Sequence, residues 1–336
     1  MRVALIAASL VALATPAAAD TVSEFYKGKS VSLMVSGSAG GGYDLLARAI
    51  AKHLGKHIPG NPAVVVKNVP GAGGLLLTNQ IYNVLPKDGT VIGSVQNNVP
   101  FEPLYGTKEA DYDPNKMIYL GSPGSEVSII TVWHGANVAT LAEARKRELT
   151  MGSSGQNSTP SFYARLANAT LGTKLKIVVG YPGQNDVLFA MERGEVDGHP
   201  SAFYNSLMAS RPNWIKDRKV HLLVQFGAAK EPAIADVPLA TELAANPEDR
   251  RLIEEASAPL AIGRPYVMAP GVPADRVAAL RKAFADTVKD PEFQADSERA
   301  QLGANQLQPG ESLQATIARS YAAPPAVIER LRKLQQ

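Results

Sequence analysis

The sequence predicts an α/β fold with two lobes, each a mostly parallel sheet flanked by helices. Apolar, strand-like runs alternate with amphipathic, helix-like segments, which is typical of parallel sheets with crossover helices. Glycine- or serine-rich loops follow several of the strand-like runs. The chain has 336 residues, which exceeds the roughly 100–200 residues of one typical domain. Two lobes around a shared cleft account for all three observations.

Eight short runs predict strands, because each is rich in apolar or β-branched residues and is bounded by glycine, proline or polar residues. The run at 91–95 ends in the polar residues Gln96, Asn97 and Asn98, and the run at 149–152 leads into a serine-rich loop. In chain order, we expect strands at 31–35, 63–67, 91–95, 127–133, 149–152, 176–179, 195–198 and 220–226.

The helices are predicted from apolar spacing and from their end signals. Ser158 and Thr159 offer N-cap groups, and Pro160 suits the first helical position. Val277, Leu280 and Phe284 form one apolar stripe in the C-terminal region. In chain order, we expect helices at 44–57, 75–85, 141–148, 160–171 and 186–193, and a mostly helical region from residue 273 onward.

The N-terminal segment has the layout of a secretory signal peptide. Arg2 precedes an apolar run at 3–14 and a small-residue end at 16–19. The run is shorter than the ~20 apolar residues that span a bilayer. It has no polar face, which argues against an amphipathic anchoring helix. We expect cleavage after Ala19 and a mature periplasmic chain that starts at Asp20.

Composition excludes several function classes. The formal net charge of +3, without a basic run, gives no support to nucleic-acid binding. The chain has no cysteine, so it has neither a disulfide framework nor a lipid-attachment cysteine. No run after the signal peptide is long and apolar enough to predict a membrane span. We therefore expect an exported globular protein whose stability comes from its core.

The stretch from Ser36 to Arg48 predicts an anion-binding site. It places a glycine-rich turn between a strand and a helix N-terminus. The first amides of a helix have no internal partner, and the helix dipole adds partial positive charge there. Loops of similar chemistry follow other predicted strands, and the carboxyl ends of parallel strands meet at one edge of a sheet. The loops expected to share a cleft are 36–44, 68–74, 96–98, 153–159 and 181–184.

A set of short motifs resembles the periplasmic receptors of tripartite tricarboxylate transporters, the TctC or Bug-type solute-binding proteins. Each motif is weak alone, but their order and spacing hold from about Phe25 to Gly303. The motifs are Ala39-Gly40-Gly41-Gly42-Tyr43-Asp44 with Ala47-Arg48, Asn68-x-Pro70-Gly71-Ala72-Gly73-Gly74, Pro86-x-Asp88-Gly89-Thr90, Gly152-Ser153-Ser154-Gly155 with Ser158, Tyr181-x-Gly183, Gly194-x-Val196-Asp197, and Asp236-Val237-Pro238 with Glu242.

This resemblance implies a type II-like periplasmic-binding-protein clamp that holds a small organic carboxylate between its lobes, without a cofactor or a metal. Residues 20–128 and 262–336 would form lobe 1, and residues 129–261 lobe 2. Membrane subunits of a tripartite transporter would be the partners of a monomeric receptor. The expected ligand-binding residues are Ser38, Gly40, Gly41, Gly42, Tyr43, Gln96, Asn97, Ser154, Gly155, Asn157, Ser158, Tyr181 and Tyr204.

Departures from the family pattern bear on the ligand. The chain has three consecutive glycines followed by the bulky Tyr43, it has Pro182 where the family often has lysine, and Phe203 and Tyr204 add aromatic rings. These residues favour an aromatic or elongated acid over citrate. Replacing Tyr43 with alanine is expected to change ligand preference more than folding.

Other site types have weaker support. The glycine loop lacks the spacing of a nucleotide-binding loop. His53 and His57 are four residues apart, but a metal site wants a third ligand, and Leu54 stands where a zinc protease needs glutamate. An exported hydrolase or lyase would need a nucleophile–base pair, which is not evident. A ligand sensor built on the same clamp stays an alternative to a transport receptor. For Arg264 a structural role is favoured over contact with a distal carboxylate.

Overall fold

The structure, a computed structural model, describes residues 17–37, 39–156 and 158–335. Most of the predicted signal peptide, together with Ser38 and Asn157, therefore lies outside the described residues. Helix α1 (Ala17–Tyr26) runs across the expected cleavage point, which stays a prediction. None of the described helices has the length and apolar character needed to cross a membrane.

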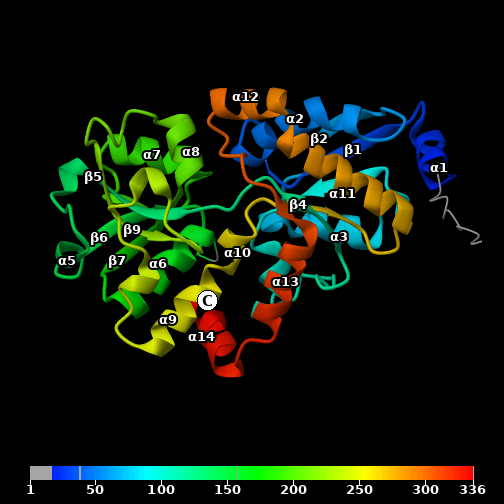
Figure 1. The fold of residues 1–336 in the computed structure, drawn as a ribbon. Coiled ribbons are helices and arrows are strands. Elements are labelled where there is room, and N and C mark those ends of the chain that lie inside the picture. The colour runs from blue at the N-terminus through cyan, green and yellow to red at the C-terminus, as the bar shows by residue number, and fades with distance from the viewer. Residues whose placement is uncertain (1–16, 38, 157, 336) are drawn as a thin grey trace, which may run out of the picture.

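Two sheets form the two lobes, which lie side by side in Figure 1. The first sheet has the order β11-β4-β10-β3-β1-β2 and the second has the order β7-β6-β8-β5-β9. The strands are β1 (Ser30–Val35), β2 (Ala63–Asn68), β3 (Val91–Ser94), β4 (Ile118–Ser122), β5 (Ser128–Trp133), β6 (Leu149–Ser153), β7 (Leu175–Val179), β8 (Gly198–Phe203), β9 (Val220–Phe226), β10 (Tyr266–Met268) and β11 (Gln308–Pro309).

Helices cover both sheets and connect their strands. They are α2 (Gly42–Leu54), α3 (Leu75–Asn83), α4 (Glu102–Tyr105), α5 (Leu141–Ala144), α6 (Thr159–Leu171), α7 (Gln184–Glu192), α8 (Tyr204–Ser210), α9 (Pro247–Ala256), α10 (Ala258–Ala261), α11 (Ala274–Lys289), α12 (Pro291–Arg299), α13 (Gly310–Tyr321) and α14 (Pro325–Gln335). The predicted two-lobed α/β architecture is confirmed.

Both sheets are mixed, which corrects the expectation of mostly parallel sheets. β1 pairs in parallel with β2 and β3, and β6 pairs in parallel with β7 and β8. β10 runs antiparallel to β3 and β4, and β5 runs antiparallel to β8 and β9. β5 and β10 are the first strands after the chain passes from one lobe to the other. A local strand–helix–strand unit therefore does not set their direction.

The first lobe shows how sequence pattern becomes packing. Val31, Leu33 and Val35 alternate along β1 and are fully buried. On α2, Leu46 and Ile50 recur at helical spacing and join the same core. Burying each such side chain contributes about 1.5–3 kcal/mol. Together these contacts hold the loop between β1 and α2 between two packed elements.

One predicted strand begins later than expected. The sequence suggests a strand at 195–198, whereas β8 starts at Gly198. Asp197 explains the difference, because its carboxylate accepts hydrogen bonds from the amide of Thr150 at 2.7 Å and from its hydroxyl at 2.8 Å. These hydrogen bonds keep the residues just before β8 in a turn beside β6. They also help to set the register of β8.

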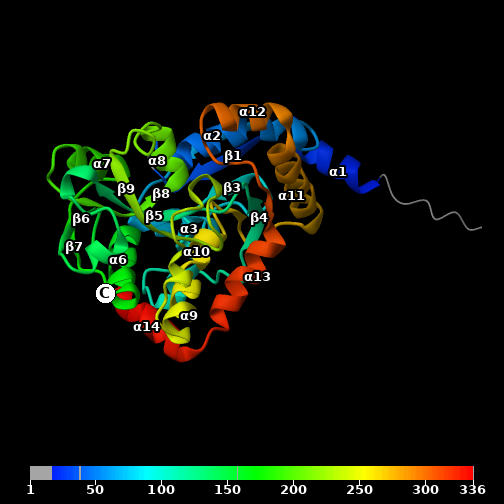
Figure 2. The same cartoon turned by 60° about the vertical axis from the view of Figure 1, so that its left-hand side comes forward.

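The C-terminal helix α14 lies beneath the second lobe, close to α9 (Figures 1 and 2). Ile328 and Leu331 belong to the second-lobe core. Arg165 on α6 donates hydrogen bonds to the carbonyls of Leu334 and Gln335 at 2.6 and 3.1 Å. The lobe boundaries inferred from the resemblance stay a prediction, and α14 adds a contact from the C-terminal region to the second lobe.

The two passages between the lobes touch at two glycines. Gly263 has a φ of +64°, and a Cβ added there would lie 1.7 Å from the carbonyl oxygen of Gly124. No side chain fits between the two segments. Only glycine combines this backbone conformation with this approach.

Replacing Gly263 with alanine is expected to lower the free energy of unfolding by more than the ~1 kcal/mol that left-handed backbone alone costs. Chemical denaturation measures the change. Gly172→Ala is the matched control, because Gly172 has a φ of +70° and open space around the added Cβ. Equal losses for the two variants would contradict the close approach.

Candidate functional site

Hydrogen bonds to Asp44 fix the loop before α2, and no side chain caps the N-terminus of this helix. Gly41 occupies the N-cap position, and no side chain caps this end of the helix. The buried Asp44 accepts hydrogen bonds from the Gly40 amide (2.8 Å), Arg48 Nε (3.0 Å) and Asn68 Nδ2 (2.9 Å). Burial opposes the ionisation of Asp44, but these donors outweigh it and hold its pKa below the usual range. These hydrogen bonds fix the glycine loop, and no side chain caps the helix that follows it.

Tyr43 links this loop to the end of β3. The Asn97 amide donates a hydrogen bond to the Tyr43 hydroxyl at 3.1 Å. Burial raises the pKa of Tyr43, so the ring is a neutral phenol. The guanidinium of Arg264 lies 5.3 Å from the ring centroid, within the range of a cation–π contact. The predicted residues Tyr43 and Asn97 are therefore in direct contact.

The serine loop before α6 forms a second compact group. Ser153 Oγ lies 2.7 Å from both Ser158 Oγ and Ser161 Oγ. Ser158 and Ser161 donate hydrogen bonds to the Gly155 carbonyl at 2.7 and 2.6 Å. Ser158 occupies the N-cap position, but its hydroxyl does not cap the helix. The N-terminus of α6, like that of α2, therefore has no side-chain cap.

A cavity that is partly open to solvent lies where the lobes meet, and we call it the interlobe cavity. Its first wall comes from the end of β3 and from α4, and its second wall from the N-terminal half of α6. The segment around α10 and the end of α14 complete it. The residues that line it are Asn97, Asn98, Glu102, Tyr105, Thr159, Phe162, Tyr163, Ala256, Pro259, Leu260 and Gln335.

Asn97 joins the cavity to the glycine loop. It is 5% exposed and lines the cavity, and its Nδ2 has no hydrogen-bond partner in the described part of the chain. A buried amide group without a partner costs about 1–3 kcal/mol. A ligand acceptor at this position would remove that cost. Thr159, the first residue of α6, lines the same cavity.

The other predicted residues have less direct connections. Gln96 is half-buried beside Gly74, Ser154 is exposed, and the Tyr181 amide donates to the Ser153 carbonyl at 3.3 Å. The Tyr204 amide donates to the Val127 carbonyl at 2.9 Å, at the passage between the lobes. Among the described residues of the predicted set, Asn97 alone lines the interlobe cavity. Ser38 and Asn157 lie outside the described residues.

Sequence reasoning missed the aromatic and acidic walls of the cavity. Glu102 and Tyr105 lie on the short helix α4, which has no amphipathic pattern long enough to read. Leu260 belongs to the equally short α10. The segment after Asn98 reads Val-Pro-Phe-Glu-Pro-Leu-Tyr, which has no regular polar–apolar alternation. These residues reach the cavity through tertiary packing.

Arg264 connects both lobes and both passages. Its Nε lies 2.7 Å from Glu126 Oε1, and both side chains are 5% exposed. The geometry is that of an ion pair rather than an aligned hydrogen bond, since Nε has no hydrogen-bond partner. Its terminal nitrogens donate to the Gly42 carbonyl at 2.9 Å and to Ser206 Oγ on α8 at 3.3 Å. This favours the predicted structural role over contact with a ligand.

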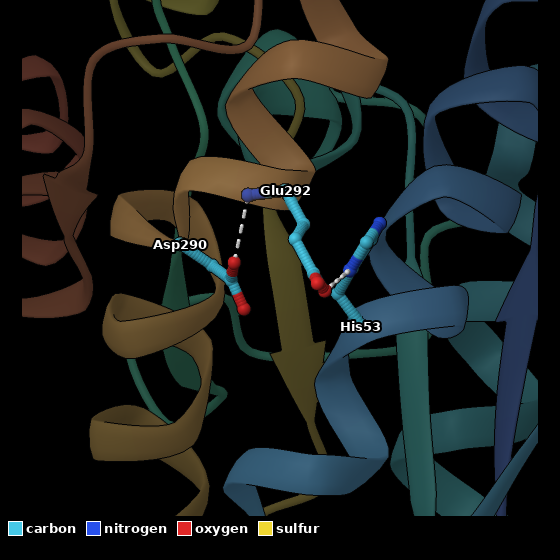
Figure 3. Close-up of side chains that lie close together, drawn as sticks. All are labelled: His53, Asp290 and Glu292. Carbon is cyan, nitrogen blue, oxygen red and sulfur yellow. Dashed lines mark hydrogen bonds and ion pairs between the residues drawn. The ribbon is translucent and has the colours of Figure 1, made fainter.

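A separate cluster, formed by His53, Asp290 and Glu292, has the residue types of a metal site (Figure 3). Lys56 Nζ lies 2.7 Å from a carboxylate oxygen of both Asp290 and Glu292. A cation already placed between the two carboxylates favours an ion-pair network over a metal site. Lys52 and His53 extend this network to Asp296 on α12. It joins the end of α2 to the start of α12.

Comparisons with known proteins agree with this architecture. The family model described as "Tripartite tricarboxylate transporter family receptor" (TctC) matches residues 46–311. A UPF0065 protein in the gbd 5′ region of Cupriavidus necator is 26% identical over 249 residues, which are 71% of this chain and 72% of that protein.

Two solved structures illustrate the structural likeness. A TctC solute binding protein from Polaromonas has 22% identity and a TM-score of 0.68, over 92% of this chain and 98% of that one. MatC from Rhodopseudomonas palustris, solved with bound malate, has 18% identity and a TM-score of 0.68, over 92% and 99%. At these identities the likeness concerns the fold alone.

Replacing Arg264 with methionine is expected to lower the free energy of unfolding by about 3–5 kcal/mol, because Glu126 stays buried without its cation. The double variant Glu126→Gln/Arg264→Met should recover most of that loss. Urea denaturation measures both. The control is Arg250→Met, which breaks an exposed pair with Glu254 worth ~0.3–0.5 kcal/mol. A loss as small as the control's would refute the bridging role.

The α2–α12 network is expected to lose its contribution to stability in acid. Hydrogen bonds from Lys52 and His53 lower the pKa of Asp296 to about 2. The folded pKa is thus below the unfolded value of about 3.9. The stabilisation is therefore present above pH ~4 and is lost as the pH falls towards 2.

Urea denaturation of the wild type and Asp296→Asn between pH 2 and pH 6 tests this. The difference between the two should be largest near pH 6 and should shrink below pH 4. Glu298→Gln, at an exposed position on the same helix, is the control. A difference that does not change with pH would contradict the prediction.

Proposed function

Because the chain belongs to the tripartite tricarboxylate transporter receptor family, we propose that it is a periplasmic receptor that binds a small organic carboxylate between its lobes. The family model covers residues 46–311, which is most of the chain. This family is a class of solute-binding receptors rather than enzymes. Membrane subunits of a tripartite transporter would be the partners that receive the ligand.

One observation carries the ligand class. Two helices, α2 in the first lobe and α6 in the second, begin without a side-chain cap at the loops expected to bind an anion. Asn97 connects them, since its amide donates to Tyr43 and its side chain lines the cavity that Thr159 also lines. Uncapped helix N-termini attract anions through free amides and the helix dipole.

The malate-bound MatC and an adipate-bound Rhodopseudomonas palustris protein of 20% identity support a carboxylate as the ligand. The predicted ligand contacts are the loop at 38–43, the Gln96–Asn97 pair, the loop at 154–158, Tyr181 and Tyr204. Closure of the lobes would be a hinge motion that the ligand favours by binding the closed form more tightly. Arg264 at the passages would hold the start of α2 against α8 of the second lobe.

The ligand can be identified by mass spectrometry of small molecules released when the purified protein is denatured. We expect an organic acid. A differential scanning screen of carboxylates should then show stabilisation that increases with ligand concentration. Recovery of a nucleotide or a sugar, with no stabilisation by any acid, would refute the proposal.

The variant Tyr43→Phe is expected to weaken ligand binding, because Asn97, whose side chain lines the cavity, loses the hydrogen bond that fixes its backbone. Phenylalanine keeps the ring packed, whereas alanine would also remove core contacts. Titration calorimetry measures the affinity. Tyr82→Phe, on α3 outside the cavity, is the control. Unchanged affinity in Tyr43→Phe would mean that Tyr43 only packs.

A further inference from the structure

The interlobe cavity contains one charged side chain among the residues that line it, the carboxylate of Glu102. Glu102 is fixed in place by two donors. Asn98 Nδ2 donates to Oε1 at 2.7 Å, and Thr107 Oγ1 donates to Oε2 at 2.5 Å. The negative charge therefore has a defined position on the first-lobe wall. Among the described residues that line the cavity, no arginine, lysine or histidine neutralises this charge.

Two hydrogen-bond donors also line this cavity. Thr159 begins α6, a helix of 13 residues whose N-terminus has no side-chain cap. Asn97 Nδ2 is a second donor, buried and without a partner among the described residues. A helix N-terminus together with an unpartnered amide provides a place for one carboxylate.

Apolar and aromatic groups form the rest of the walls. Phe162, Tyr163 and Leu260 are all at most 5% exposed. Burial raises the pKa values of Tyr105 and Tyr163, so both rings stay uncharged. Tyr163 also uses its hydroxyl to donate to the Ala256 carbonyl at 2.9 Å. These surfaces suit an uncharged ligand body rather than a second ionised group.

We infer that the ligand is an organic acid with one carboxylate and an uncharged apolar or aromatic body, and that Glu102 excludes acids with a second carboxylate. This inference rests on the proposed function, because it assigns a ligand class to the same interlobe site. A second carboxylate would share a partly buried cavity with the Glu102 charge. Like charges at short range in such surroundings repel strongly. Glu102 is therefore a specificity-determining residue.

Titration calorimetry with two acids tests the inference on the mature protein after dialysis. The probes are 3-phenylpropionate and adipate. We expect 3-phenylpropionate to bind roughly tenfold or more tightly than adipate, which has a second carboxylate. Tighter binding of adipate to the wild type would overturn the inference.

The variant Glu102→Gln should raise the affinity for adipate by roughly tenfold and leave that for 3-phenylpropionate within about threefold. Glu109→Gln, an exposed position in the same lobe, makes the same change in net charge and should leave the ratio unaltered. An unaltered ratio in Glu102→Gln would also overturn the inference. A thermal melt without ligand shows whether the variant folds. If it does not, the relative affinities of the wild type for the two acids still test the inference.

Failure of the inference can be told apart from failure of the proposed function. Binding of adipate in preference to 3-phenylpropionate would leave a carboxylate receptor whose ligand class differs from the one inferred. If no acid binds and none is released from the denatured protein, the proposed function itself fails.

Discussion

The buried ion pair between Arg264 and Glu126 is the interaction on which the arrangement of the two lobes depends. The chain passes between the sheets twice, and each passage contributes one partner. Burying two charges is costly, and the desolvation penalty can exceed their attraction. Burial raises the pKa of Glu126, and Arg264 offsets that rise only in part. The pair persists because the guanidinium also bonds the Gly42 carbonyl and Ser206, so one cation connects both passages and both lobes.

The same residue connects architecture with the ligand site. Gly42 is the first residue of α2, and Tyr43 follows it beneath the Arg264 guanidinium. Tyr43 in turn accepts from the amide of Asn97, which lines the interlobe cavity. The position of the glycine loop relative to the second lobe is therefore set by charge and hydrogen bonds rather than by apolar packing alone. Such contacts are directional and favour one arrangement of the lobes.

The elements with long, regular patterns could be predicted from the sequence, and the contacts between distant segments could not. β1, α2 and α6 follow from apolar spacing and end signals, and α11 buries the predicted Leu280 and Phe284. The antiparallel direction of β5 and β10 could not be read, because it results from the passage between lobes. Local signals also led to an incomplete account of the site. They predicted Tyr43, Asn97 and Ser158. In the structure hydrogen bonds fix Tyr43 and Ser158, and Asn97 lines the cavity. Glu102 and Tyr105, which also line it, were not predicted.

The interlobe cavity is built from segments that lie far apart in the sequence, and this affects folding. Its walls come from four stretches, around Asn97, Thr159, Leu260 and Gln335, which are separated by many tens of residues. Contacts between such distant segments form late, because closing long loops costs entropy before the contacts can repay it. A partly folded chain therefore has no complete cavity. A ligand that occupies it will act on the finished fold, slowing unfolding more than it speeds folding.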